Sequence, residues 1–165
     1  MKIIGIDVGK SGGIAIINED GSLTLHTIPL IGKEVDLLTM FKILQENTKE
    51  KHIVAIEDVT SLQGVSAKAN FSFGENKGHY EGLLVGMKAT YQKVAPKTWQ
   101  KVCWEGVPIQ KKSTGKNDTK ATSLLSARRL FPNESFLATV RSSVPHDGLI
   151  DAALIAKYLE IKYRS

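Results

Sequence analysis

The chain has 165 residues, of which 42% are hydrophobic and 24% charged, and its formal net charge at pH 7 is +5. This length predicts one globular domain spanning residues 1–165, with a core of its own. No apolar run is long enough to cross a bilayer and no secretory leader precedes the first strand, so we expect a cytoplasmic protein without a membrane partner. The single cysteine, Cys103, excludes an internal disulfide and is expected to be a small buried hydrophobe.

The charge is spread unevenly along the chain. Between Lys88 and Arg129 the sequence has ten basic and two acidic residues, a local charge of +8, whereas the remainder sums to −3. A basic segment beside an acidic remainder predicts a polyanionic partner, with the acids serving another purpose. The alternative is a lysine-rich face that only meets solvent.

The first predicted element is the near-continuous apolar run 2–9, a pattern typical of a strand buried on both faces. It contains one acid, Asp7, whose ionised form is costly to bury unless it is paired or holds a cation. Capping of the backbone is the structural alternative for this side chain. Two further strands, at 14–17 and 23–28, follow through glycine-containing turns and complete an antiparallel meander.

A second buried strand is expected at 52–59, after a helix over 34–49 in which apolar residues recur at helical spacing. Because it follows a helix, this strand should lie parallel to the first and beside it. It ends in two acids, Glu57 and Asp58. Neighbouring side chains of a strand point to opposite faces, so only one of them can face the same way as Asp7, and the alternation does not choose between them.

Small polar residues over 60–70 predict a mobile loop directly after this acidic strand end. Phe71 and Phe73 follow, and either core packing or a wedge between DNA bases would suit such a pair. A helix is then expected over 74–90. Four glycines recur along it at every fourth position, each at a cost of about 1 kcal/mol relative to alanine. This stripe predicts close approach of another backbone, from a neighbouring helix or a second subunit, unless the segment is not helical throughout. The glycines are Gly74, Gly78, Gly82 and Gly86.

The basic segment contains a short strand at 91–95, a helix that opens with Pro96, and a helix that ends near Arg129. Between the two helices, residues 106–117 form a polar basic loop that we expect to be disordered without a ligand. Trp99 and Trp104 are expected to be packing residues. The candidate phosphate contacts are the lysines of this region, namely Lys101, Lys111, Lys112, Lys116 and Lys120.

The last predicted element is a helix over 144–159 that carries Asp147 and Asp151 four residues apart, hence on one face. Like charges at this spacing repel unless something neutralises them. Asp147 could simply cap the helix, but this does not explain Asp151, which is surrounded by apolar residues.

The acids of these separate elements can converge if the last helix packs across the sheet beside the first strand. The set is Asp7, Glu57, Asp147 and Asp151. Carboxylates gathered at one point are tolerated around divalent cations, and a ligand set made of oxygen atoms alone selects Mg²⁺ or Mn²⁺. Two such ions could clamp a phosphodiester and activate a water molecule for its hydrolysis.

Several motifs, taken in order, resemble the RuvC-like Holliday junction resolvases, and most of all the branch encoded by bacteriophages. They are the segments 5–9, 56–59 and 146–156, with 71–74, 96–101, 118–121 and 128–132 between them. The resemblance covers nearly the whole chain. It implies an α/β protein of RNase H-like fold, with a mixed five-stranded sheet flanked by helices. It also implies a homodimer that makes paired Mg²⁺-dependent nicks in branched DNA, leaving 5′-phosphate and 3′-hydroxyl ends.

The resemblance also implies roles for individual residues. Asp7 would bridge the metal ions, Glu57 would be the acid at the strand end, and Asp151 the inner acid of the last helix. Bacterial members carry their other helix ligand three residues before the last Asp, where this chain has Gly148. We therefore expect Asp147 to be the fourth ligand, with His146 as the alternative.

Phe73 would insert at the branch point of the DNA, as aromatics after the acidic strand do in the family.

Three other function classes stay open. One is a different RNase H-like nuclease acting on forks, flaps or RNA–DNA hybrids. Another is a non-catalytic protein that binds branched DNA. The third is an ATPase of the actin and sugar-kinase type, whose first strand is similar; those proteins need two lobes, so no nucleotide cofactor is expected here.

Overall fold

A mixed five-stranded sheet runs through the protein in the computed structural model, which describes residues 1–59, 64 and 66–164. Its strand order is β3-β2-β1-β6-β7. The first three strands pair antiparallel as a meander, and β6 and β7 extend the sheet in parallel. The strands are β1 (Lys2–Asp7), β2 (Gly13–Ile17), β3 (Leu23–Thr27), β6 (His52–Glu57) and β7 (Tyr91–Val94). The predicted fold class is confirmed.

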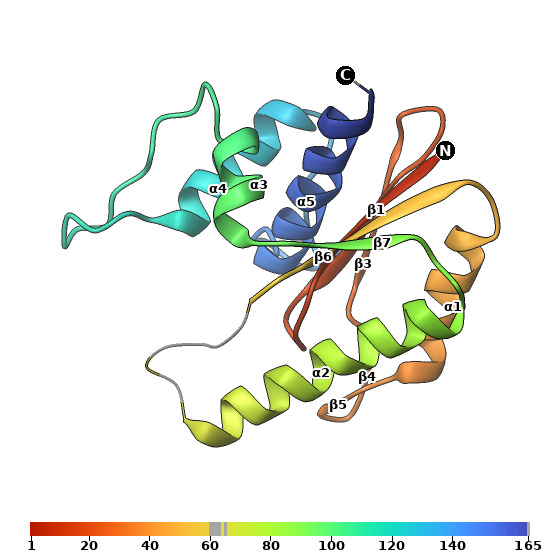
Figure 1. The fold of residues 1–165 in the computed structure, drawn as a ribbon. Helices are drawn as coiled ribbons and strands as arrows, with labels where there is room; N and C mark the ends of the chain where they lie inside the picture. The colour runs from red at the N-terminus through yellow and green to blue at the C-terminus, as the bar shows by residue number, and fades with distance from the viewer. Residues whose placement is uncertain (60–63, 65, 165) are drawn as a thin grey trace.

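Helices cover both faces of the sheet (Figure 1). They are α1 (Leu37–Thr48), α2 (Ala67–Gly86), α3 (Pro96–Cys103), α4 (Thr119–Leu130) and α5 (Asp147–Arg164). Ile3 of β1 packs in the core beneath α3, α4 and α5, whereas Ile4 packs in the core beneath α1 and α2. Because successive side chains enter opposite cores, the strand is apolar along its length. Within the described ranges, no helix has the length and apolar character needed to cross a membrane.

Helix α5 lies directly on the backbone of β1 and of the turn into β2. A Cβ at Gly5 would fall 2.2 Å from the carbonyl oxygen of Ala152, and a Cβ at Gly148 would fall 2.3 Å from that of Ser11. Both distances are far below van der Waals contact, so only glycine fits at these two positions. The start of α5 is thereby held against the end of β1.

Three helices begin elsewhere than predicted, and one of them, α5, starts at Asp147 instead of 144 and continues to Arg164. Strands β4 (Leu30–Ile31) and β5 (Glu34–Val35) form a small hairpin, so α1 starts after Asp36, whose carboxylate accepts hydrogen bonds from the next turn. Helix α2 starts at Ala67, seven residues early, because the Ser66 hydroxyl caps it by accepting from the backbone N–H of Ala69. The predicted 60–70 loop therefore ends in a helix, and its residues 60–63 and 65 lie outside the described part of the chain.

The segment 106–118, called the basic arm, is folded. The expectation of disorder over 106–117 is wrong. Lys111 and Asn117 form an antiparallel bridge, and the backbone N–H of Lys112 donates to the carbonyl of Lys116 at 2.8 Å. Gly115 permits the turn, since its φ is +77°. The arm closes at its base, where the N–H of Asp118 donates to the carbonyl of Gln110. In Figure 1 it projects from the body of the molecule between α3 and α4.

Candidate active site

Asp7 and Glu57 stand side by side at one edge of the sheet. Strands β1 and β6 are parallel, and their register places Ile6 opposite Ile56, so the next residue of each strand is an acid. Both acids share the face on which α5 lies, and their carboxyl groups are within hydrogen-bonding reach of each other. Register therefore selects Glu57, the choice that the sequence pattern had left open.

Asp58 is held away from this pair. Its carboxylate accepts from the ammonium group of Lys77 on α2, at 2.5 Å, and the same ammonium approaches the carbonyl of Val59 at 3.4 Å. Asp58 is thus part of the contact between α2 and the end of β6.

Helix α5 adds Asp151 and Asp147 to the site. Asp151 is the inner acid: one of its carboxylate oxygens, Oδ1, is buried with no hydrogen-bond partner among the described residues. Ser123 of α4 lies close enough to lower the pKa of this carboxyl group. Asp147 lies one turn earlier, is exposed, and forms an ion pair with Lys120 at 2.6 Å. The charges of both act on Asp7, so the structure brings the four acids into one region; their binding of metal stays a prediction.

Burial and crowding disfavour negative charge on the three inner acids. Burial, then the charges of Glu57 and Asp151, raise the pKa of Asp7 well above its usual value. Burial also raises the pKa of Glu57, against hydrogen bonds from Trp99 and Asp7 that lower it. The pKa of Asp151 is raised to about 7, mainly by burial. A cation bound among these acids would favour their ionised forms and lower the three pKa values.

The first turn of α5 explains why the fourth acid stands at position 147. Gly148 faces the carbonyl of Ser11 and the backbone of Gly12, so no side chain can occupy that position. His146 is used as a cap: its Nδ1 accepts from the backbone N–H of Leu149 at 3.3 Å, and its carbonyl accepts from the N–H groups of the same turn. This geometry favours Asp147 over His146 as a ligand, and which of them binds metal stays a prediction.

The four carboxylates form an oxygen-only donor set, the kind that suits Mg²⁺ or Mn²⁺. In the described part of the chain, no three His, Cys, Asp or Glu side chains form a ready-made metal site. Asp7 and Glu57 contact each other, and Asp147 is turned to Lys120. The buried Oδ1 of Asp151 has no hydrogen-bond partner among the described residues. This fits the role of a cation ligand, because a buried oxygen of this kind is costly to leave unpaired.

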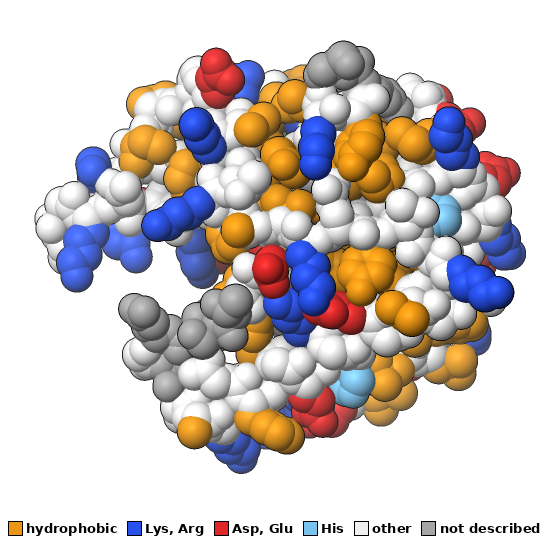
Figure 2. All heavy atoms as spheres, viewed as in Figure 1, with side chains coloured by type: hydrophobic (Ala, Val, Ile, Leu, Met, Phe, Trp, Pro, Cys, Tyr) orange, Lys and Arg blue, Asp and Glu red, His pale blue; other side chains and the backbone are white. Residues whose placement is uncertain are grey.

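The predicted DNA contacts lie on and beside the basic arm. Lys101 on α3 and Lys111, Lys112 and Lys116 on the arm are exposed. Lys and Arg side chains gather over this region in Figure 2, above a hollow that separates the arm from the start of α2. Lys120 is also exposed, but its ammonium is already paired with Asp147.

The two phenylalanines of α2 are differently placed. Phe73 packs partly buried against the core beneath α1 and α2, whereas the Phe71 side chain is 75% exposed. Phe71 is therefore the better candidate for a base wedge, a role that the sequence analysis gave to Phe73. Along the same helix, a Cβ on any of the four glycines would meet nothing within 4 Å, so the stripe faces open space within this chain.

Trp99 and Ser123 lie next to acids of the site, and Lys77 holds Asp58 away from it; none of the three was predicted from the sequence. The indole N–H of Trp99 donates to Oε1 of Glu57 at 3.1 Å, and the Lys77 and Ser123 contacts are those given above. Only one feature of the sequence indicated Trp99: it lies five residues after the end of β7, the strand that pairs with β6. Nothing in the pattern distinguished Lys77 or Ser123.

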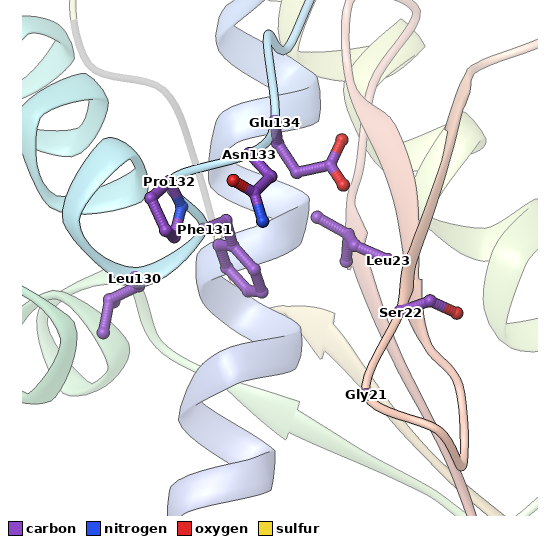
Figure 3. Close-up of a pocket in the computed structure, with 8 residues that line it drawn as sticks. All are labelled: Gly21, Ser22, Leu23, Leu130, Phe131, Pro132, Asn133 and Glu134. Carbon is purple, nitrogen blue, oxygen red and sulfur yellow. The ribbon is translucent and has the colours of Figure 1, made fainter.

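One pocket lies apart from the acids. It has a volume of about 350 Å³ and is formed by the β2–β3 turn, at 21–23, and the segment 130–134 that follows α4 (Figure 3). It is lined by residues of both segments, Phe131 among them, and by none of the four acids.

Solved structures with this arrangement of sheet and helices include Holliday junction resolvases. RuvC of Thermus thermophilus in complex with a Holliday junction substrate matches 99% of this chain and 96% of its own, with a TM-score of 0.61 and 14% sequence identity. Another structure of Thermus thermophilus RuvC gives a TM-score of 0.59 at 16% identity over the same shares of both chains.

The yeast mitochondrial resolvase Ydc2 matches 94% of this chain and 75% of its own, with a TM-score of 0.57 and 14% identity. The fold is that of RuvC. No protein-family model matches the sequence, and no curated protein matches it. At these identities the likeness concerns the RuvC fold, and the chemistry rests on the four acids described above.

Proposed function

We propose that this protein is a metal-dependent endonuclease that nicks branched DNA such as Holliday junctions. The observation that carries the proposal is the convergence of Asp7, Glu57 and Asp151, with Asp147 at the rim, on the α5 face of a RuvC-like sheet. The resolvases of the same fold, one of them in complex with a Holliday junction substrate, supply the substrate class.

The acids would bind two Mg²⁺ ions, or Mn²⁺ in their place. When bound, such ions neutralise the carboxylates, polarise the phosphodiester and lower the pKa of a water molecule. The charges of Glu57, Asp151 and Asp147 all act on Asp7, which makes Asp7 the residue best suited to hold both ions. Asp147 would leave Lys120 to join the site, and the freed ammonium would then be available to a phosphate oxygen. Hydrolysis of this kind leaves 5′-phosphate and 3′-hydroxyl ends.

The basic arm would hold the DNA backbone beside the acids. Its lysines carry no partner from the acid cluster, and the arm stands on the same side of the sheet as α5. Lysines that neutralise phosphates make binding fall steeply with salt concentration.

Two such sites on one branched DNA would require a homodimer. The open glycine stripe of α2 would allow a second α2 to approach at backbone distance, with Phe71 at its edge. Sedimentation of the wild type and of Gly82→Leu tests this: loss of the dimer in the variant is expected, and a monomeric wild type would refute it.

Cleavage of a panel of DNAs tests the proposed activity. The panel holds a four-way junction, a fork, a flap, a linear duplex and an RNA–DNA hybrid, each with Mg²⁺ and with Mn²⁺. The wild type should nick the junction, and Asp7→Asn and Glu57→Gln should bind it without cleavage. Asp58→Asn is the matched control, because this acid faces Lys77 and not the site. Normal cleavage by Asp7→Asn would overturn the metal mechanism, and preferential cleavage of the hybrid or flap would move the substrate to the alternative class.

A further inference from the structure

Glu57 is held by a residue that lies outside the acid cluster. The indole N–H of Trp99, on α3, donates to Oε1 of Glu57 at 3.1 Å. We propose that Trp99 is a positioning residue, which fixes the carboxylate of Glu57 toward Asp7 so that this acid binds metal in one orientation. The inference rests on the proposed function, since it concerns the same metal site.

The Trp99 ring is itself rigidly placed. Its side chain is 1% exposed in the core beneath α3, α4 and α5, and it meets Trp104 edge to face, with ring centroids 6.3 Å apart at 87°. It can donate but not accept, so its partner must be an acceptor such as a carboxylate oxygen.

The backbone on either side of this hydrogen bond is fixed as well. Glu57 pairs with Val94 in the sheet, and α3 begins two residues after Val94 at Pro96. Strand β7 thus aligns the backbone of Glu57, and the helix that follows it reaches back to the side chain. A glutamate has three rotatable side-chain bonds, so this second contact removes freedom that the backbone pairing cannot.

The expected consequence follows from how outer groups act on metal ligands. A hydrogen bond from such a group orients the ligand, and its removal typically costs 10–100-fold in metal affinity or activity. An indole N–H also favours the ionised carboxylate over the neutral acid, because a charged oxygen accepts a stronger hydrogen bond than a neutral one. Trp99 therefore works against the burial that disfavours charge on Glu57.

The neighbouring tryptophan provides a matched control. Trp104 is partly buried and packs against the same core, yet its Nε1 is buried without a hydrogen-bond partner among the described residues. Replacing either tryptophan by phenylalanine removes one indole N–H and a similar volume. Only the change at Trp99 removes a hydrogen bond to an acid of the site.

The experiment compares Trp99→Phe with Trp104→Phe by two measurements. The first is the Mn²⁺ dissociation constant, taken from the rise of Tm with Mn²⁺ concentration. The second is the kcat and KM for nicking a four-way junction. We expect Trp99→Phe to weaken Mn²⁺ binding and to lower kcat by 10–100-fold with KM for the DNA little changed, and Trp104→Phe to stay within about threefold of the wild type. Equal effects of the two variants would overturn the inference.

A second measurement guards against a Trp99 variant that fails to fold, because it keeps both tryptophans. The Nε1–H resonances of the two tryptophans are followed by NMR in wild type and in Glu57→Ala. Loss of the acceptor should move the resonance of Trp99 and leave that of Trp104 in place; an unmoved Trp99 resonance refutes the hydrogen bond. This readout and the Mn²⁺ titration need no DNA, so they can fail independently of the cleavage assay. The proposed nuclease activity fails if the wild type cuts no branched DNA.

Discussion

Replacing Asp151 by asparagine should make the metal-free protein more stable at pH 8. In the folded chain, burial raises the pKa of Asp151 from 3.8 to about 7. The unfolded chain ionises this group near pH 4, so the folded state is the one that holds the proton between these two values. The free energy of unfolding should therefore fall as the pH rises from about 4 to about 7 and stay level above.

The size of the effect can be worked from the shift. Raising the pKa of Asp151 from 3.8 to about 7 lowers the free energy of unfolding at pH 8 by about 4 kcal/mol. The amide introduced by Asp151→Asn would meet the same partnerless surroundings as Oδ1 does now, at a cost of about 1–3 kcal/mol. A net gain of about 1–3 kcal/mol remains, which for a domain of this size is a rise in Tm of roughly 2–12 °C.

Thermal unfolding of wild type and Asp151→Asn in EDTA, at pH 4.5, 6 and 8, measures this gain. The variant should have the higher Tm at pH 8, and this difference should disappear at pH 4.5. Mn²⁺ should raise the Tm of the wild type more than that of the variant. Asp20→Asn is the control, because this exposed acid has its pKa lowered by hydrogen bonds from Ser22 and should gain nothing as the pH rises. A Tm difference between Asp151→Asn and wild type that is the same at all three pH values would refute the reasoning.

Three further predictions concern packing and DNA contact. Gly148→Ala should lower the free energy of unfolding in urea by about 1–3 kcal/mol, since the new Cβ would meet the Ser11 carbonyl. Gly78→Ala, whose Cβ would meet open space, should raise it by up to about 1 kcal/mol in the monomer. Equal stabilities of the two variants would contradict this packing. Phe73→Ala should destabilise the fold and Phe71→Ala should not, while Phe71→Ala alone should slow junction nicking; unaltered nicking would remove Phe71 as a wedge. Changing Lys111 and Lys112 together to alanine should reduce the slope of log affinity against log salt by about 2, and an unchanged slope would mean that both lysines only meet solvent.

The sheet and the acid cluster could be predicted from the sequence because both depend on local patterns that the fold keeps. Apolar runs fixed the two central strands, and the four-residue spacing fixed the common face of Asp147 and Asp151. The choice between Glu57 and Asp58 could not be made from alternation alone. It depends on the pairing of Ile6 with Ile56, which is set by contacts between strands about fifty residues apart in the chain.

Other features escaped prediction for different physical reasons. The basic arm looked like a disordered segment because its composition is polar, but its order comes from backbone hydrogen bonds that composition does not reveal. Helix α2 extends past its expected start because one cap at Ser66 outweighs the weak helix preference of the following residues. The importance of Gly148 depends on the backbone of a turn at the other end of the sequence, so it became visible only once α5 was placed.

The direct contact of α5 with the backbone of β1 has a consequence for synthesis of the protein. Two of the four acids reach the site only when this helix has docked, since Asp147 and Asp151 both belong to it. A growing chain that ends before residue 147 has Asp7 and Glu57 alone, and two carboxylates would be too few for a pair of cations. Under the proposed function, a ribosome-bound or partly unfolded molecule would therefore be harmless to the cell's DNA, and nuclease activity would arise in the same step that completes the core.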